Sequence, residues 1–286
     1  MSRQASIVIA LAYATLFLYG LVDNVRGPVF PDLLKDFALG DTVGSIFFSC
    51  ASAAALVSNV TASWWLRVWG EMRSVRIFCA LQCVSLATFA FATSYPMLLV
   101  GAALFGIALG GLGLLVNVLT AVAAPAHLRR QLLSGLHCMY GISSLLSPIL
   151  VTLFYQAGSG WRTVFAALSL GPIVIFLASF GSRVETHEPP IPTEAPVDGS
   201  LQTGRVLWYA FSIATYVIVE ILVSTRLVLY ARRDLGYSVE DANQLLSLFY
   251  LAMFAGRFFF AVVRVPFSHA TLQYSAILST LAAITA

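Results

Sequence analysis

The chain has 286 residues, of which 59% are hydrophobic and only 10% are charged. Soluble globular domains carry charge on about a quarter of their residues, so this composition excludes that class and indicates an integral membrane protein. The formal net charge of +3 is too small to indicate a nucleic-acid partner. The sequence shows neither a nucleophile–base pair nor metal-ligand spacing, so we expect no enzyme activity, no metal and no cofactor.

The apolar residues fall into nine segments, and a bilayer-spanning helix needs about 20 such residues. Breaks separate the segments, for example Pro28 and Pro31 at the end of the first one. The predicted transmembrane helices span residues 6–30, 43–66, 75–94, 97–123, 132–155, 162–182, 206–230, 243–264 and 269–286. We therefore expect an all-α membrane protein with about nine transmembrane helices.

One long hydrophilic stretch, 183–205, interrupts these segments after the sixth helix. It is rich in proline, glutamate and serine, which cannot bury enough apolar surface to order a segment, so it is predicted to be a linker. The expected organisation is a six-helix N-terminal bundle (1–182), the linker (183–205) and part of a C-terminal bundle (206–286).

The arginines predict the orientation in the membrane. Cytoplasmic loops of membrane proteins carry an excess of Lys and Arg. With the N-terminus and the linker inside, the inner segments hold Arg3, Arg67, Arg73, Arg76, Arg129, Arg130, Arg183, Arg205 and Arg264. The outer segments then hold Lys35, Arg162, Arg232 and Arg233, and the adjacent Arg232 and Arg233 are an exception to the pattern. We expect a cytoplasmic N-terminus and a cytoplasmic linker.

A repeat relates the two parts of the chain. Tyr19–Asp23 reads Y-G-L-V-D and Tyr216–Glu220 reads Y-V-I-V-E, an offset of 197 residues (216 minus 19) that places one carboxylate at the same point in each segment. Repeated helix sets are typical of transporters built from two related halves. Two such halves predict about 390–400 residues and about twelve helices, so we interpret the chain as lacking the last three. A nine-helix protein is the alternative.

Five charged residues inside the predicted spans stand out as candidates. They are Asp23 and Arg26 in the first helix, Glu220 and Arg226 in the seventh, and Arg257 in the eighth. Each costs about 2.5–3.5 kcal/mol to insert at mid-membrane, so each is a functional candidate. Asp23 and Arg26 are three residues apart on one helix face and can pair.

Two interpretations of the carboxylates stay open. Burial raises the pKa of a carboxyl group and a neighbouring arginine lowers it, so a conformational change can drive proton uptake and release. Asp23 is then the proton-coupling residue and Glu220 contacts the solute; alternatively, both are static ion pairs or vestibule charges. Arg26, Arg226 and Arg257 are candidates for gating or structural charges.

Polar uncharged groups also cluster in the first bundle. A pocket that binds hydroxyl groups needs amides that both donate and accept hydrogen bonds from an otherwise apolar wall. Each group taken alone also fits an interhelical hydrogen bond. Together with His137, the amides predict a hydrophilic path: Asn24, Asn59, Gln82 and Asn117. The candidate solute-binding residues among them are Asn24, Asn59, Asn117 and His137.

Several motifs resemble the major facilitator superfamily. They include Gly160-Trp161-Arg162 and a loop, 66–73, that shares Gly70 with the family signature but has Arg67 at the position of its aspartate. The stretch 136–148 is similar to the fifth helix of fucose-permease-like sugar transporters, through Leu136-His137, Tyr140-Gly141 and Ser147-Pro148. The stretch 216–257 is similar to the seventh and eighth helices of the same group, through Tyr216, Glu220, Gly256 and Arg257.

The resemblance implies the major facilitator fold and uptake of a hexose or deoxyhexose. In that group, transport is often coupled to protons through an acid in the first helix, matched here by Asp23, and another in the fourth. The fourth helix offers only Asn117, and Arg226 replaces the tryptophan common in the seventh.

From the sequence we therefore expect a secondary active transporter of a small polar organic solute, most plausibly a sugar, with protons and the bilayer as its other partners. The alternatives are an exporter of amphiphilic compounds and a non-transporting membrane paralogue.

Overall fold

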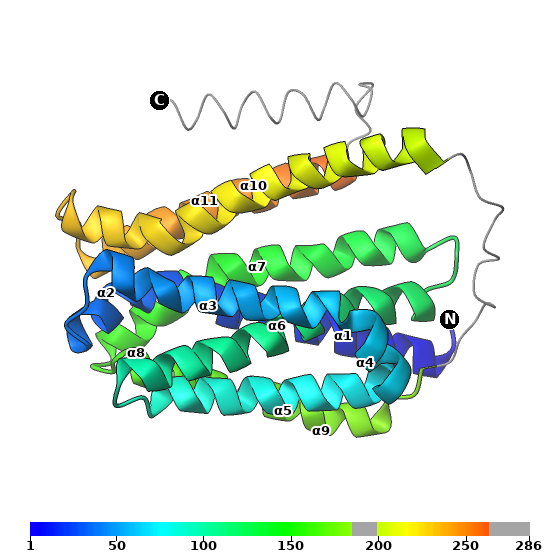
Figure 1. The fold of residues 1–286 in the computed structure, drawn as a ribbon, viewed down its shortest axis with the longest axis horizontal. Coiled ribbons are helices and arrows are strands. Elements are labelled where there is room, and N and C mark those ends of the chain that lie inside the picture. The colour runs from blue at the N-terminus through cyan, green and yellow to red at the C-terminus, as the bar shows by residue number, and fades with distance from the viewer. Residues whose placement is uncertain (185–198, 263–286) are drawn as a thin grey trace.

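The computed structural model describes residues 1–184 and 199–262, and every regular element within them is a helix (Figure 1). In chain order the elements are α1 (Arg3–Asn24), α2 (Arg26–Asp36), α3 (Asp41–Val60), α4 (Ala62–Trp69), α5 (Glu71–Ala90), α6 (Tyr95–Ala123), α7 (Arg129–Gln156), α8 (Trp161–Leu168), α9 (Leu170–Ala178), the short 3-10 helix η1 (Ser179–Gly181), α10 (Gly199–Arg233) and α11 (Val239–Val262).

The predicted membrane segments are confirmed as helices wherever the structure describes them. Seven helical stretches in the described part are long and apolar enough to cross a membrane, and they coincide with the first seven predicted segments. The eighth predicted segment coincides with α11. The ninth, 269–286, and most of the predicted linker lie outside the described residues, so the domain boundaries stay a prediction.

The first segment extends further than its prolines predict. The chain turns at Val25 and continues as α2 to Asp36, past Pro28 and Pro31. Pro28 lies in the first turn of α2, where a helix has no partner for its N–H groups and a proline therefore costs little. Pro31 lies further along, inside α2, so neither proline ends the segment and the sequence-based end at residue 30 was too early.

The helices of the N-terminal bundle (α1–α9) run along the long axis of the molecule, except α4, which crosses one end (Figure 1). We call this end, where α1 and α10 begin, the linker end. The opposite end, which carries α2, the start of α3 and the end of α10, is the α2 end. The C-terminal pair (α10 and α11) covers one face of the bundle, with α10 against α2 and α11 against α7.

Glycines on α6 let it pack directly against α3. A Cβ atom on Gly106 would fall within 3.0 Å of the Ala51 carbonyl oxygen, and one on Gly110 would lie 2.6 Å from that of Ala55. Real Cβ atoms essentially never come so close to other heavy atoms. Gly106 and Gly110 are four residues apart, the G-x-x-x-G spacing that permits close backbone packing of membrane helices.

We expect Gly106→Ala to lower the free energy of unfolding by about 1–3 kcal/mol, the usual cost of overpacking, because neither backbone can move aside cheaply. Thermal unfolding of the detergent-solubilised protein measures this. Gly204→Ala is the control, since a Cβ there meets no atom within 4 Å in the described structure. An equal loss of stability in both variants would contradict the packing role of Gly106.

Candidate functional site

A central cavity of about 490 Å³ lies between the N-terminal bundle and α10. The bundle contributes Tyr19, Asp23 and Tyr140 to its wall, and α10 contributes Glu220 and Ser224. The two carboxylates of the sequence repeat therefore line one cavity from opposite sides. The structure thus brings the two carboxylates selected by the repeat to one cavity between the two parts of the chain.

Asp23 and Arg26 form the ion pair that their spacing predicts, with side chains only 17% and 12% exposed. Arg26 Nε also donates to the Asp23 carbonyl oxygen at 3.0 Å, and its guanidinium lies 4.7 Å from the ring centroid of Phe105 and 5.5 Å from that of Phe48. The second Asp23 oxygen accepts a hydrogen bond from the Tyr140 hydroxyl at 3.2 Å. Each charge is therefore compensated within the cavity wall.

Asn24 is held by hydrogen bonds on both sides of its amide. Its Nδ2 donates to the Gly20 carbonyl oxygen at 2.8 Å and to Ser144 Oγ at 2.9 Å, and its Oδ1 accepts from the Tyr250 hydroxyl. The residue is 6% exposed and joins α1 to α7 and α11. Both N–H groups of the amide are therefore in use, and Oδ1 keeps one lone pair for a further donor.

A second cavity, of about 560 Å³, adjoins the first toward the linker end. Both cavities are lined by Tyr19, Asn59 and Tyr140, and the second adds Asn117 and His137. Asn117 Nδ2 donates to the Gly113 carbonyl oxygen of its own helix at 2.8 Å, which leaves its carbonyl oxygen for the cavity. The predicted hydrophilic path therefore corresponds to two connected cavities.

Two sequence candidates lie elsewhere. Gln82 is 2% exposed and faces a separate void of about 20 Å³ within the bundle, so it is not part of the path. The backbone of Arg257 lies in α11, and its side chain is outside the described part of the chain.

Ion pairs join the C-terminal pair to the bundle at the α2 end. Arg232 binds Asp32 through two contacts of 2.9 and 3.3 Å, and Tyr155 donates to the same carboxylate at 3.0 Å. Arg233 pairs with Asp41. The adjacent arginines that depart from the positive-inside pattern thus have carboxylate partners across the interface.

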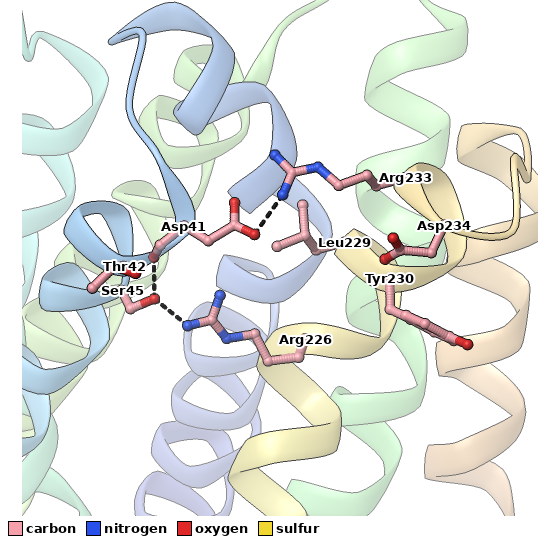
Figure 2. Close-up of a pocket in the computed structure, with 8 residues that line it drawn as sticks. All are labelled: Asp41, Thr42, Ser45, Arg226, Leu229, Tyr230, Arg233 and Asp234. Atoms are coloured by element: carbon pink, nitrogen blue, oxygen red, sulfur yellow. Dashed lines mark hydrogen bonds and ion pairs between the residues drawn. The ribbon is translucent and has the colours of Figure 1, made fainter.

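A third cavity, of about 510 Å³, opens at this interface between α3 and α10. Figure 2 shows Arg233 directed at Asp41 and Arg226 at Ser45, each joined to its partner across the gap. The Arg226 guanidinium also lies 5.3 Å from the ring centroid of Phe30. Arg226 therefore belongs to the contacts at the α2 end and not to the central cavity.

Sequence reasoning missed Asp32 and Asp41, because both lie near helix ends where a carboxylate is ordinary. The signal that could have found them was the pair Arg232 and Arg233, which departs from the positive-inside pattern and lies at the same end of the molecule. Tyr19 was also missed, although it opens the repeated Tyr19–Asp23 motif.

Comparison with known proteins supports the fold. The protein TsgA of Escherichia coli O1:K1 is 23% identical over 259 residues, which cover 88% of this chain and 64% of the relative. The chain thus spans less than two thirds of the length of this curated relative.

Two solved transporter structures show the same fold. A D-xylose–proton symporter superposes with a TM-score of 0.66 at 16% identity, covering 88% of this chain and 67% of the other. A bacterial homologue of the human lysosomal transporter Spinster gives a TM-score of 0.71 at 13% identity, covering 87% and 60%.

The family model of the Major Facilitator Superfamily matches residues 12–286. The match runs through both parts of the sequence repeat and through every helix that lines the central cavity. With the helical architecture and the shared cavity between two parts of the chain, it establishes that this chain belongs to the Major Facilitator Superfamily.

Proposed function

We propose that the protein is a secondary active transporter that moves a small polar organic solute, a sugar, across a membrane by alternating access. The observation that carries the proposal is the central cavity, to which the N-terminal bundle contributes Asp23 and α10 contributes Glu220. A site built from both halves is exposed to one side or the other as the halves rock about it. Relatives of this fold carry different solutes, so the solute class is argued from the cavity wall and not from the fold.

The cavity wall suits a solute with several hydroxyl groups. Tyr19, Ser52, Asn59 and Thr225 supply groups that donate and accept hydrogen bonds. The volume of about 490 Å³ lies within the range of about 300–1,000 Å³ that is usual for small-molecule sites. An amphiphilic compound would leave these polar groups without partners, and for this reason we favour a sugar over such a compound.

Alternating access is supported by the difference between the two ends. The pairs Asp32–Arg232 and Asp41–Arg233 tie the halves together at the α2 end, whereas the second cavity extends from the central one toward the linker end. We assign the linker end to the cytoplasm from the arginine distribution. The described arrangement is then one in which the outer end is shut.

Asp23 is the proposed proton-coupling residue. In the described arrangement it is paired with Arg26 and bonded to Tyr140. We expect movement of the halves to separate Arg26 from Asp23, so that a proton replaces the arginine as the partner of this carboxyl group. A static ion pair would instead leave transport independent of the proton gradient.

We expect Asp23→Asn to abolish sugar accumulation driven by an inward proton gradient while exchange of sugar across the membrane continues, because exchange needs no net proton movement. Uptake of a panel of labelled sugars into proteoliposomes, with and without an imposed pH gradient, measures both. Glu240→Gln is the control, since Glu240 lies in the first turn of α11 and in none of the three cavities. Wild-type uptake that ignores the proton gradient would refute the coupling.

We expect Glu220→Gln to raise the apparent Km for the sugar by about 10- to 100-fold, because a hydrogen bond to a charged group contributes about 1.5–3 kcal/mol. Initial uptake rates over a range of sugar concentrations measure the change. Gln244→Ala, at an exposed position of α11, is the matched control and should leave the Km unchanged. An unaltered Km in Glu220→Gln would remove Glu220 from the solute site.

The same preparation separates the two alternatives. Extrusion of amphiphilic dyes without sugar uptake would identify an exporter of amphiphilic compounds. Saturable sugar binding without flux in any direction would identify a non-transporting membrane protein.

A further inference from the structure

Gly27, at the start of α2, lies directly against the backbone of α10. A Cβ atom at this position would fall within 3.0 Å of the Ser224 carbonyl oxygen and 3.6 Å from the Thr225 Cα atom. Both obstacles are main-chain atoms of a helix, which cannot rotate away as a side chain can. Gly27 is buried, and its contact joins the N-terminal bundle to the C-terminal pair.

This contact occupies a particular level in the molecule. Gly27 and Ser224 both line the central cavity, Gly27 directly after Arg26 and Ser224 one helical turn after Glu220. The ion pairs of Arg232 and Arg233 lie beyond it, at the α2 end. The Gly27–Ser224 contact is therefore a wall between the solute site and that end.

The contact differs physically from the ion pairs beyond it. Arg232 and Arg233 reach their partners through long side chains, so those pairs tolerate small changes in the distance between the halves. The contact between the two backbones does not tolerate an added side chain, because helices approach this closely only where a residue lacks one.

We propose that Gly27 is a positioning residue that allows the central cavity to close at the α2 end. With any side chain at position 27, α10 is held away from α2 and the cavity stays open on that side. The proposal rests on the alternating-access function proposed above, and it adds the residue on which closure at that end depends.

The test is the accessibility of the cavity from the α2 side in the Gly27→Ala variant of the intact protein. Ser52 lines the cavity from α3 and is exposed to it, so Ser52→Cys is the reporter, in a background without Cys50, Cys79, Cys83 and Cys138. A membrane-impermeant maleimide is added to sealed vesicles from the outside. We expect Gly27→Ala to raise the labelling rate by about tenfold, which corresponds to a tenfold shift in the open population.

Gly101→Ala is the control, because its Cβ would lie 2.9 Å from the ring of the buried Phe89, within the N-terminal bundle and away from the central cavity. It should destabilise the protein without changing the labelling of Ser52→Cys. Equal labelling in Gly27→Ala and the parent, or an equal rise in Gly101→Ala, would overturn the proposal.

A second measurement covers the folding of the variant. The two halves can separate at the Gly27 contact, so Gly27→Ala should fold to a monodisperse protein, and the disulfide between Asp41→Cys and Arg233→Cys should form less readily in it than in the parent. A Gly27→Ala protein that does not fold, or that forms this disulfide as readily, would contradict the proposal. The labelling experiment needs no solute, so it is independent of the proposed function. Faster labelling of Gly27→Ala in a protein that takes up no sugar would refute only the proposed transport. Sugar uptake with no change in the labelling rate would refute only the role of Gly27.

Discussion

The ion pair between Asp23 and Arg26 is the interaction on which the central part of the structure depends. Either charge alone in this largely buried position would be costly, whereas together they sit in a wall that supplies a hydroxyl and two aromatic faces. The pair spans the turn at Val25, with Asp23 at the end of α1 and Arg26 at the start of α2. The residues 23–27 therefore carry both the charges of the cavity wall and the backbone contact at the α2 end.

The second half of the site acts on that segment from α10. Glu220 faces the cavity, and the backbone one turn further on rests against Gly27. A movement of α10 relative to α2 thus changes two things at once: the surroundings of the Asp23–Arg26 pair and the closure of the cavity. Coupling between charge and access follows from this proximity and needs no long-range path through the bundle.

Much of this arrangement was predictable from the sequence. Hydrophobic runs located the helices, and the repeat of Tyr19–Asp23 in Tyr216–Glu220 selected the two carboxylates that share the cavity. The contact between Asp32 and Arg232, 200 residues apart, was not predictable, because nothing local to Asp32 indicates Arg232. The close approach at Gly27 was hidden for a similar reason, since a glycine before a proline also fits an ordinary turn. Polarity alone misplaced Gln82, because its helix turns it into the bundle and away from the cavities.

The central claim is that a solute binds in the cavity between the two halves. Protection of a cysteine in the cavity wall tests it most directly, and Leu56→Cys is suited because Leu56 lines the cavity and offers the solute no polar group. The account predicts that a transported sugar slows labelling of this cysteine in a saturable manner, with half-protection near its Km for uptake. Labelling that no sugar slows, in a protein that nevertheless takes up sugar, would place the solute elsewhere and contradict the account.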